Sequence, residues 1–313
     1  MDKVLAYKTL EEKTTSFECE AGFVFGDIDF LFEKLEELYL QGSFIFRGVS
    51  NASYKLYSTA QREFLKRELW ALGGPNDAQE VFNNWINILL KNVKLWNNGS
   101  ISEFFQRIGV SKDDDLAYLS FLQHNGLPTP LIDFTFDPFI AIYFATEHPN
   151  YSLDRISIDS CFSLYYINKN DLLNKALNAD NKSKTLDVKL KFNEFIKQNA
   201  ITIIYHNTAN HKILTSMNIV NQKGCFVFNW HAVKPLEESY SDLISDLKSP
   251  LFKKKIHDQL QTKINCINIH KSLAPRIQQE LLKRKLIDKE YVYPEFSSSK
   301  YRLIDTSISE LIK

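Results

Sequence analysis

The segment that most constrains how this chain can fold covers residues 122–138. It sets Gln, His, Asp and Thr side chains around a single glycine, Gly126, and the prolines Pro128 and Pro130, and apolar segments lie on both sides. Because Gly and Pro mark changes of backbone direction, we expect a rigid, non-repetitive connector between two buried elements. The connector ends in Asp137 and Pro138, the pattern of a helix N-cap followed by proline at the first helical position.

The polar residues of this connector, among them His124, Asp133 and Thr135, allow two interpretations. Binding and catalytic sites are often built from polar side chains on a stiff loop over a packed scaffold. Asp and Thr side chains also commonly satisfy the backbone groups of their own loop. In the first interpretation, Asp133 orients His124 as a general base across the tight loop. The sequence alone leaves both interpretations open.

The charges of the chain balance. Its 313 residues include 38 Lys and Arg residues and 38 Asp and Glu residues, so the formal net charge is zero. This balance provides no global attraction to nucleic acid or to an anionic membrane, although it does not exclude a local basic patch. Residues 1–8 lack the apolar core of a signal peptide, and no apolar run approaches the length of a membrane span. We therefore expect a cytoplasmic protein with no membrane partner.

The cysteines predict neither a disulfide framework nor a zinc site. All four are far apart, and none belongs to a CxxC pair. Three of them, Cys161, Cys225 and Cys266, lie in apolar runs, which favours buried free thiols in a reducing compartment. The spacing of His206 and His211 fits no common zinc pattern, so we predict no metal.

Apolar periodicity predicts the order of secondary structure. Residues 43–48 are expected to form a strand that pairs with residues 54–58 across a turn. The helix that opens near Asp77 should bury one face, composed of Val81, Trp85, Ile88 and Leu89. Further helices are expected over residues 27–41, 61–70, 113–122, 138–145, 237–256 and 272–287, and further strands over residues 161–167, 200–206, 224–229 and 264–270.

Helices followed by strands interleaved with helices are typical of an α+β fold. We expect a mixed, mainly antiparallel sheet with packed helices and an N-terminal helical region. The expected organisation is a helical extension over residues 1–42, a main domain over 43–299 and a tail over 300–313. Residues 178–187 and 294–299 are expected to be loops. The sequence has no GxGxxG, P-loop, GxSxG or HExxH motif.

Several motifs, in order along the chain, are similar to those of the FRG domain family, which is named for a Phe-Arg-Gly motif. They are Phe46-Arg47-Gly48, the pair Ser58 and Arg62, the run from Gln123 to Thr129, Asp133-Phe134-Thr135 followed by Ala141 to Ala145, Gln222 to Phe226, and Tyr293 to Phe296. The matches extend roughly from residue 46 to residue 296. One position departs from the family pattern, because Pro130 occupies the place where the family usually has Arg.

The resemblance implies a biological context, and a more distant similarity implies a type of reaction. FRG proteins are commonly associated with bacterial mobile elements and phage defence. The order of elements also resembles the Arg–Ser-Thr-Ser–Glu class of ADP-ribosyltransferases, and this similarity implies an ADP-ribosyltransferase-like fold. By this analogy Arg47 would bind phosphate and Thr135 would lie on the Ser/Thr strand. Gln222 and Gly224 would occupy the Gln-x-Glu position, with Gly224 in place of the catalytic Glu.

The expected site follows from these residue types. A guanidinium suits bidentate recognition of phosphate, although Arg47 could instead form a structural salt bridge with Asp133. Glutamine amides can read an amide such as nicotinamide, and a carboxylate can stabilise an oxocarbenium-like transition state. We predict His124 and Asp133 as catalytic residues, and as ligand-binding residues Arg47, Gly48, Ser58, Arg62, Gln123, Thr135 and Gln222.

Three functional hypotheses remain. The leading one is a bacterial toxin or anti-phage defence effector acting on a nucleotide, with NAD as the leading candidate, by ADP-ribosyl transfer or glycohydrolysis. Its partners would include a protein target, an antitoxin or a phage-derived trigger. The second is a non-catalytic nucleotide-sensing or protein-interaction module, favoured by Gly224 and Pro130. The third, an RNA-targeting toxin, is disfavoured by the zero net charge and the lack of clustered metal-binding carboxylates.

Overall fold

A computed structural model describes the fold of this chain. The described residues are 5–19, 27–73, 77–147, 157–170, 201–205, 207–208, 211–212, 217–247 and 263–294. The predicted loops at 178–187 and 294–299 and the tail at 300–313 lie wholly or almost wholly outside these ranges, as do residues 248–256 of the predicted helix.

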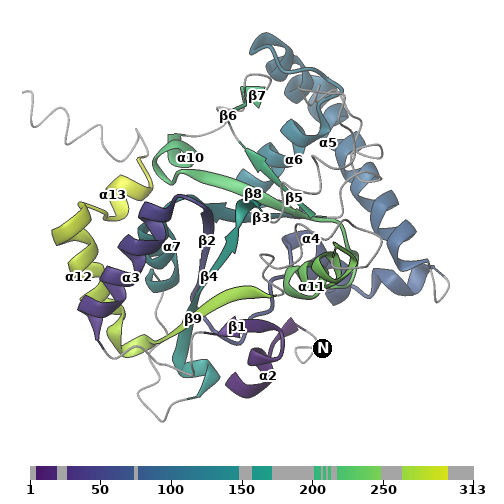
Figure 1. Cartoon of the computed structure of the whole chain (residues 1–313). Helices are drawn as coiled ribbons and strands as arrows, with labels where there is room; N and C mark the ends of the chain where they lie inside the picture. The colour runs from purple at the N-terminus through teal and green to yellow at the C-terminus, as the bar shows by residue number, and fades with distance from the viewer. Residues whose placement is uncertain are drawn as a thin grey trace, which may run out of the picture.

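A 7-stranded sheet in the order β1-β9-β4-β2-β3-β8-β5 forms the centre of the fold (Figure 1). Only β1 and β9 pair in parallel, and the other neighbouring pairs of this sheet are antiparallel. The prediction of an α+β fold with a mixed, mainly antiparallel sheet is therefore confirmed. The strands are β1 (Phe17–Cys19), β2 (Phe44–Val49), β3 (Leu131–Thr135), β4 (Cys161–Asn168), β5 (Ile201–Tyr205), β8 (Gly224–Asn229) and β9 (Ile264–His270); β6 (Asn207–Thr208) and β7 (His211–Lys212) form a separate pair.

The helices pack against the sheet in three groups. The described helices are α2 (Leu10–Thr14), α3 (Ile28–Gln41), α4 (Thr59–Lys66), α5 (Ala78–Arg107), α6 (Asp115–His124), α7 (Pro138–Thr146), α10 (Met217–Asn221), α11 (Leu236–Leu247), α12 (Ala274–Lys285) and α13 (Lys289–Val292), with short 3₁₀ turns at Leu69–Leu72, Ile158–Ser160 and Lys271–Leu273. One face of the sheet packs against α3, α7 and α12, and the opposite face packs against α11. The third apolar cluster joins α4, α5 and α6 to residues of β3 and β8.

Helix ends follow the local signals of the sequence. Asp27 caps α3 through bonds to the amides of Asp29 and Phe30, and Gly42 ends that helix at φ 63°. Asp114 caps α6 by accepting from the amide of Ala117. Asp137 caps α7 by accepting from the amide of Phe139, with Pro138 at its start. The predicted connector therefore ends in a helix as expected.

Two local predictions are wrong, and a third is correct only in part. Residues 131–135 of the predicted connector form β3, an interior strand, because β8 and β2 provide pairing partners on both sides. Residues 54–58 do not form a hairpin with β2; Tyr54 instead bridges Ala6. The fully buried stripe of α5 is formed by Phe82, Ile86 and Leu90. Three residues of the predicted face, Val81, Trp85 and Leu89, pack partly buried against the same cluster, whereas the side chain of Ile88 is 57% exposed.

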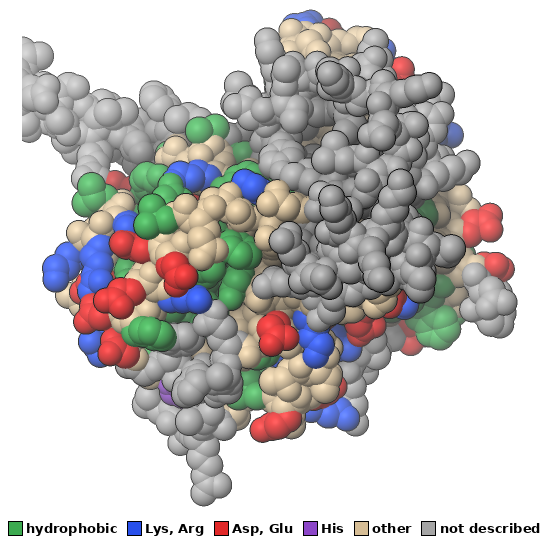
Figure 2. Space-filling model, viewed as in Figure 1, with side chains coloured by type: hydrophobic (Ala, Val, Ile, Leu, Met, Phe, Trp, Pro, Cys, Tyr) green, Lys and Arg blue, Asp and Glu red, His purple; other side chains and the backbone are tan. Residues whose placement is uncertain are grey.

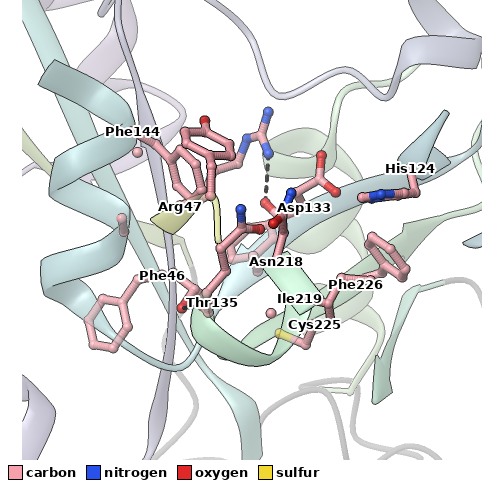
Figure 3. A pocket seen from close by; sticks show the side chains of 16 residues that line it. Phe46, Arg47, His124, Asp133, Thr135, Phe144, Asn218, Ile219, Cys225 and Phe226 are labelled. Carbon is pink, nitrogen blue, oxygen red and sulfur yellow. Dashed lines mark hydrogen bonds between the residues drawn. The ribbon is translucent and has the colours of Figure 1, made fainter. Parts of the chain in front are cut away.

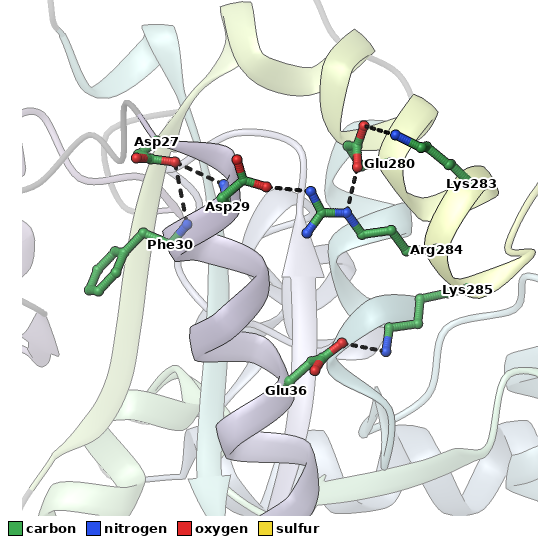
Figure 4. Close-up of polar contacts among 8 residues, drawn as sticks. All are labelled: Asp27, Asp29, Phe30, Glu36, Glu280, Lys283, Arg284 and Lys285. Carbon is green, nitrogen blue, oxygen red and sulfur yellow. Dashed lines mark hydrogen bonds and ion pairs between the residues drawn. The ribbon is translucent and has the colours of Figure 1, made fainter.

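The pair α3 and α12 lies on one side of the molecule and carries charges of both signs (Figure 2). Arg284 of α12 contacts Asp29 of α3, and Lys285 contacts Glu36 at 2.7 Å (Figure 4). Since these groups are solvent-accessible, each pair contributes at most about 1 kcal/mol to stability. The buried residues beneath them hold the two helices against the sheet.

The cysteine and membrane expectations can also be compared with the fold. Cys161, Cys225 and Cys266 are buried free thiols, as predicted, and Cys19 is a partly exposed free thiol. Within the described ranges, none of the helices has both the length and the apolar character needed to cross a membrane.

Candidate functional site

The sheet splits between β2 and β3. These strands share a single register pair, Phe46 with Thr135, whereas β2 pairs with β4 from Phe44 to Val49. Beyond Phe46 the two strands separate, and a cavity of about 590 Å³ opens there, bounded also by β8, α7 and α10 (Figure 3). The predicted site residues that line this cavity are Arg47, Gly48, His124, Asp133, Thr135 and Gln222.

Arg47 crosses the split. Its Nη1 donates to the backbone carbonyl of Asp133 at 2.6 Å, replacing a ladder bond that the strands do not make (Figure 3). Its Nε atom is buried and has no hydrogen-bond partner. Burial lowers the pKa of the guanidinium, and the nearby carboxylate of Asp133 partly offsets this effect. The predicted alternative, a salt bridge to Asp133, is not formed, because the contact is to the backbone.

The Asp133 carboxylate is oriented by Gln123 and not by His124. Asp133 Oδ2 accepts from Gln123 Nε2 at 2.8 Å, and the hydroxyl of Thr129 donates to Gln123 Oε1. Gln123 and His124 are adjacent on α6, so their side chains point about 100° apart and only one of them can face Asp133. The predicted His124–Asp133 hydrogen bond is therefore wrong, although both residues line the cavity.

Thr135 and Gln222 form the wall of the cavity. The Thr135 hydroxyl donates to the Gln222 carbonyl at 2.6 Å and accepts from the Asp137 amide at 3.0 Å. Gln222 Nε2 donates to the carbonyl of Val292 at 3.2 Å, which ties α13 to the site. Because the single hydroxyl proton of Thr135 is already used, its side chain fixes the loop. Of the two interpretations of the connector, the one in which polar side chains satisfy backbone groups therefore applies to Thr135.

Gly48 is required by helix packing. A Cβ atom at this position would lie 1.8 Å from the carbonyl oxygen of Ala141 and 2.9 Å from the amide nitrogen of Ala145. Only a residue without a side chain lets α7 lie this close to β2. Gly48, predicted as a ligand-binding residue, borders the cavity, but the element that lies against its backbone is α7.

Ser58 and Arg62 lie outside this first cavity. The buried Ser58 caps α4 in a reciprocal capping box with Gln61, so its hydroxyl has a structural role. Arg62 Nη1 donates to the carbonyl of Tyr57 at 2.7 Å. Burial lowers the pKa of Arg62, and the positive charge of Arg47 lowers it further.

A second cavity of about 690 Å³ adjoins the first. Arg47, Gly48 and Phe144 line both cavities, and Arg62 lines only the second. The other residues around the second cavity are Leu5, Ala6, Val49, Ser50, Tyr54, Lys55, Leu56 and Tyr57. The two guanidinium groups therefore face one shared space.

The structure also adds residues that sequence reasoning missed. Phe144 lies beside Arg47 (Figure 3), and its ring packs edge-on against that of Tyr293 with centroids 6.2 Å apart. Both belong to motifs noted in the sequence, the apolar helix and the Tyr-Pro-Glu-Phe segment, so these motifs held a usable signal. Asn218 of α10 also lines the cavity, and no sequence pattern identified it.

The described residues contain no group of three or more His, Cys, Asp or Glu side chains arranged to hold a metal ion. In the first cavity, Asp133 is the one acidic side chain among the described lining residues. The chemistry available there is that of a guanidinium, a carboxylate, an imidazole and side-chain amides.

Comparison with protein-family models matches residues 42–153 to the FRG domain. Neither the curated proteins nor the solved structures include a match to the chain. The matched segment covers both arginines of the two cavities, Gln123, His124 and Asp133. Gln222 and Gly224 lie beyond its end.

Proposed function

We propose that this FRG-domain protein binds a nucleotide, with NAD as the leading candidate, in the cavity at the split between β2 and β3. It would consume that nucleotide by ADP-ribosyl transfer or glycohydrolysis. One observation carries the proposal: Arg47, whose buried Nε lacks a partner, and the exposed carboxylate of Asp133 line the same cavity.

Arg47 supplies the anion contact. Within the described residues, it makes no ion pair with a carboxylate, so its charge is available to a ligand. A partly buried guanidinium binds a phosphate oxygen more strongly than a solvated one, because less water screens the charge. Its bond to Asp133 uses Nη1 and leaves Nη2 for this purpose.

Asp133 supplies negative charge at the reacting centre. Cleavage of the bond between nicotinamide and ribose develops positive charge on the ribose, and a nearby carboxylate lowers the energy of that state. The bond from Gln123 holds one carboxylate oxygen in place, so the second oxygen can face the ribose. The rings of Phe144 and Tyr293, packed edge-on against each other, offer apolar faces against which a planar heterocycle can pack.

A second candidate function is a nucleotide sensor without catalysis. It is favoured by Gly224, which lines the cavity where a second carboxylate would help transferase chemistry. It is also favoured by Thr135 and Gln222, whose side chains are committed to backbone bonds. In this case ligand binding would still require Arg47.

The biological setting follows from the family resemblance. We place the protein in the bacterial cytoplasm as a toxin or anti-phage effector, where loss of NAD would arrest the cell. A protein target, an antitoxin or a phage-derived trigger would be its partner. Because the net charge of the chain is zero, its overall charge does not favour binding to RNA.

The deciding experiment is NAD turnover by the purified protein beside Arg47→Gln and Asp133→Asn variants. Asp133→Asn keeps an oxygen acceptor for Gln123 and removes the charge. Arg67→Gln and Asp242→Asn alter exposed residues far from the cavity and serve as matched controls. Turnover lost only in the site variants supports the enzyme. Thermal stabilisation by NAD without turnover, abolished in Arg47→Gln, supports the sensor. If the wild-type protein shows neither turnover of NAD nor stabilisation by it, both functions are rejected.

A further inference from the structure

We infer that the ligand of this site spans both cavities and that Arg47 and Arg62 together hold a diphosphate between its two halves. The ligand class is then a pyrophosphate-linked dinucleotide and not a mononucleotide. This inference rests on the proposed function and goes further, because it assigns the second cavity and Arg62 to the same ligand.

The two cavities are adjacent and share three lining residues. Arg47, Gly48 and Phe144 contribute to both walls. Their volumes, about 590 and 690 Å³, each fall within the range of cavities that hold one small ligand group or a complete small ligand. A molecule with two bulky ends and a narrow charged centre fits such a pair, with its centre at Arg47.

The junction of the two cavities favours an anion. Arg47 and Arg62 both line the second cavity. The pKa of Arg62 is lowered by burial and further by the positive charge of Arg47, as expected for two like charges beside one space. Neither forms an ion pair among the described residues, whereas Lys55 in the same cavity pairs with Glu238 at 3.5 Å. Each arginine donates one hydrogen bond, to a backbone carbonyl, and keeps other donors unused.

Asp133 does not replace that anion. Its carboxylate attracts both arginines, but Gln123 holds it, and it lies within ion-pair distance of neither guanidinium. A diphosphate carries charge on two adjacent groups and can place one on each guanidinium. A single phosphate bound at Arg47 would leave Arg62 without a counter-charge.

The second cavity has walls suited to a base. Tyr54, Tyr57, Leu5 and Leu56 are among the residues that line it. Tyr57 and Leu56 are almost fully buried, and the hydroxyl of Tyr57 donates to the Val233 carbonyl at 3.3 Å, so the accessible ring is that of Tyr54. Tyr54 is 52% exposed, and a stacked base would cover it.

The test compares binding of whole and half ligands by titration calorimetry. The probes are ADP-ribose and a non-hydrolysable NAD analogue, beside nicotinamide mononucleotide and AMP. The proteins are wild type, Arg62→Gln, Tyr54→Ala and, as the control, Arg67→Gln. Arg67 is the C-cap residue of α4, the helix that carries Arg62, and it pairs with Glu63 at 2.8 Å outside both cavities.

We expect the two-lobed ligands to bind wild type at least about 10-fold more tightly than either half, because both guanidinium groups are then engaged. Arg62→Gln should weaken them roughly 10- to 100-fold and leave nicotinamide mononucleotide unchanged. Tyr54→Ala should weaken ADP-ribose and not nicotinamide mononucleotide. The control should bind every probe as wild type does.

Three results overturn the inference, and they distinguish its failure from that of the proposed function. If wild type binds these ligands but Arg62→Gln binds them equally well, the second cavity is not used and the proposed function stands. The same conclusion follows if a half ligand binds as tightly as the whole. If wild type binds no nucleotide at all, both the proposed function and this inference are rejected.

Discussion

Arg47 of β2 donates from Nη1 to the backbone carbonyl of Asp133 in β3 at 2.6 Å, across the point where the two strands part. One side chain therefore closes the sheet and faces both cavities. The same bond fixes the backbone that carries the Asp133 carboxylate. This bond therefore fixes the position of the Arg47 guanidinium relative to the strand that carries the Asp133 carboxylate, although the sheet is split there.

Replacing Arg47 by Ala should affect stability as well as binding. The bond from a charged donor to a buried strand is worth about 1–2 kcal/mol, so we expect a loss of that size in the free energy of unfolding. Urea denaturation measures it. Arg47→Lys keeps a charge but not the fork of donors, and it should recover part of the stability and little of the nucleotide binding. A variant as stable as wild type would contradict the bridging role.

Gly48→Ala should be strongly destabilising. Its Cβ would meet the Ala141 carbonyl at 1.8 Å, and α7 would have to move away from β2, at a cost of at least about 3 kcal/mol. Gly126→Ala is the contrasting variant, because Gly126 has φ 73° with open space around it. Its backbone strain alone predicts a loss of about 1 kcal/mol. Equal effects in thermal or urea unfolding would reject the packing argument.

The loss of turnover in Gln123→Ala should be close to the loss in Asp133→Asn. The loss in His124→Ala should be smaller. The reason is geometric, since Gln123 holds the carboxylate and His124 does not. Steady-state kcat/KM of the three single variants and of the Gln123/Asp133 double variant tests this. The two changes should be strongly non-additive, because they remove parts of one unit. Additive losses, or a larger loss at His124, would restore the His124–Asp133 pair as the working unit.

Glu237 should make stability depend on pH. Burial raises its pKa to about 7, although the Tyr7 hydroxyl and the Leu56 amide both donate to its carboxylate. A carboxyl whose folded pKa exceeds its unfolded value binds more protons in the folded state. Its contribution is therefore greatest below the unfolded value of about 4.5 and is lost as the pH rises through about 7.

The expected loss in unfolding free energy between pH 5 and pH 8 is on the order of 1–3 kcal/mol. Unfolding of wild type and Glu237→Gln should be compared across this range. The Gln side chain cannot ionise, so the difference between the two proteins isolates Glu237 from the neighbouring Glu238 and Tyr7. Parallel pH profiles for the two proteins would show that Glu237 does not titrate in this window.

Much of the secondary structure was predictable because its causes are local. Asp27 and Gly42 mark the ends of α3 by their own side-chain and backbone preferences. Asp137 and Pro138 start α7 in the same way. The apolar runs of β4, β8 and β9 are buried strands, as their composition indicates. The ordered motifs also pointed to the FRG domain and to the side chains that line the first cavity.

Caps, turns, alternating patterns and the motifs that carry polar groups could be identified from the amino-acid sequence. The formation of an interior strand by residues 131–135 and the contact of Gln123 with Asp133 became clear from the folded chain. The fold also shows that Gly48 serves helix packing and that Arg62 meets Arg47 at a second cavity. Caps and periodicity act between residues a few positions apart. Strand pairing, helix contact and the approach of two cations depend on segments distant in the chain, and packing of the whole core selects them.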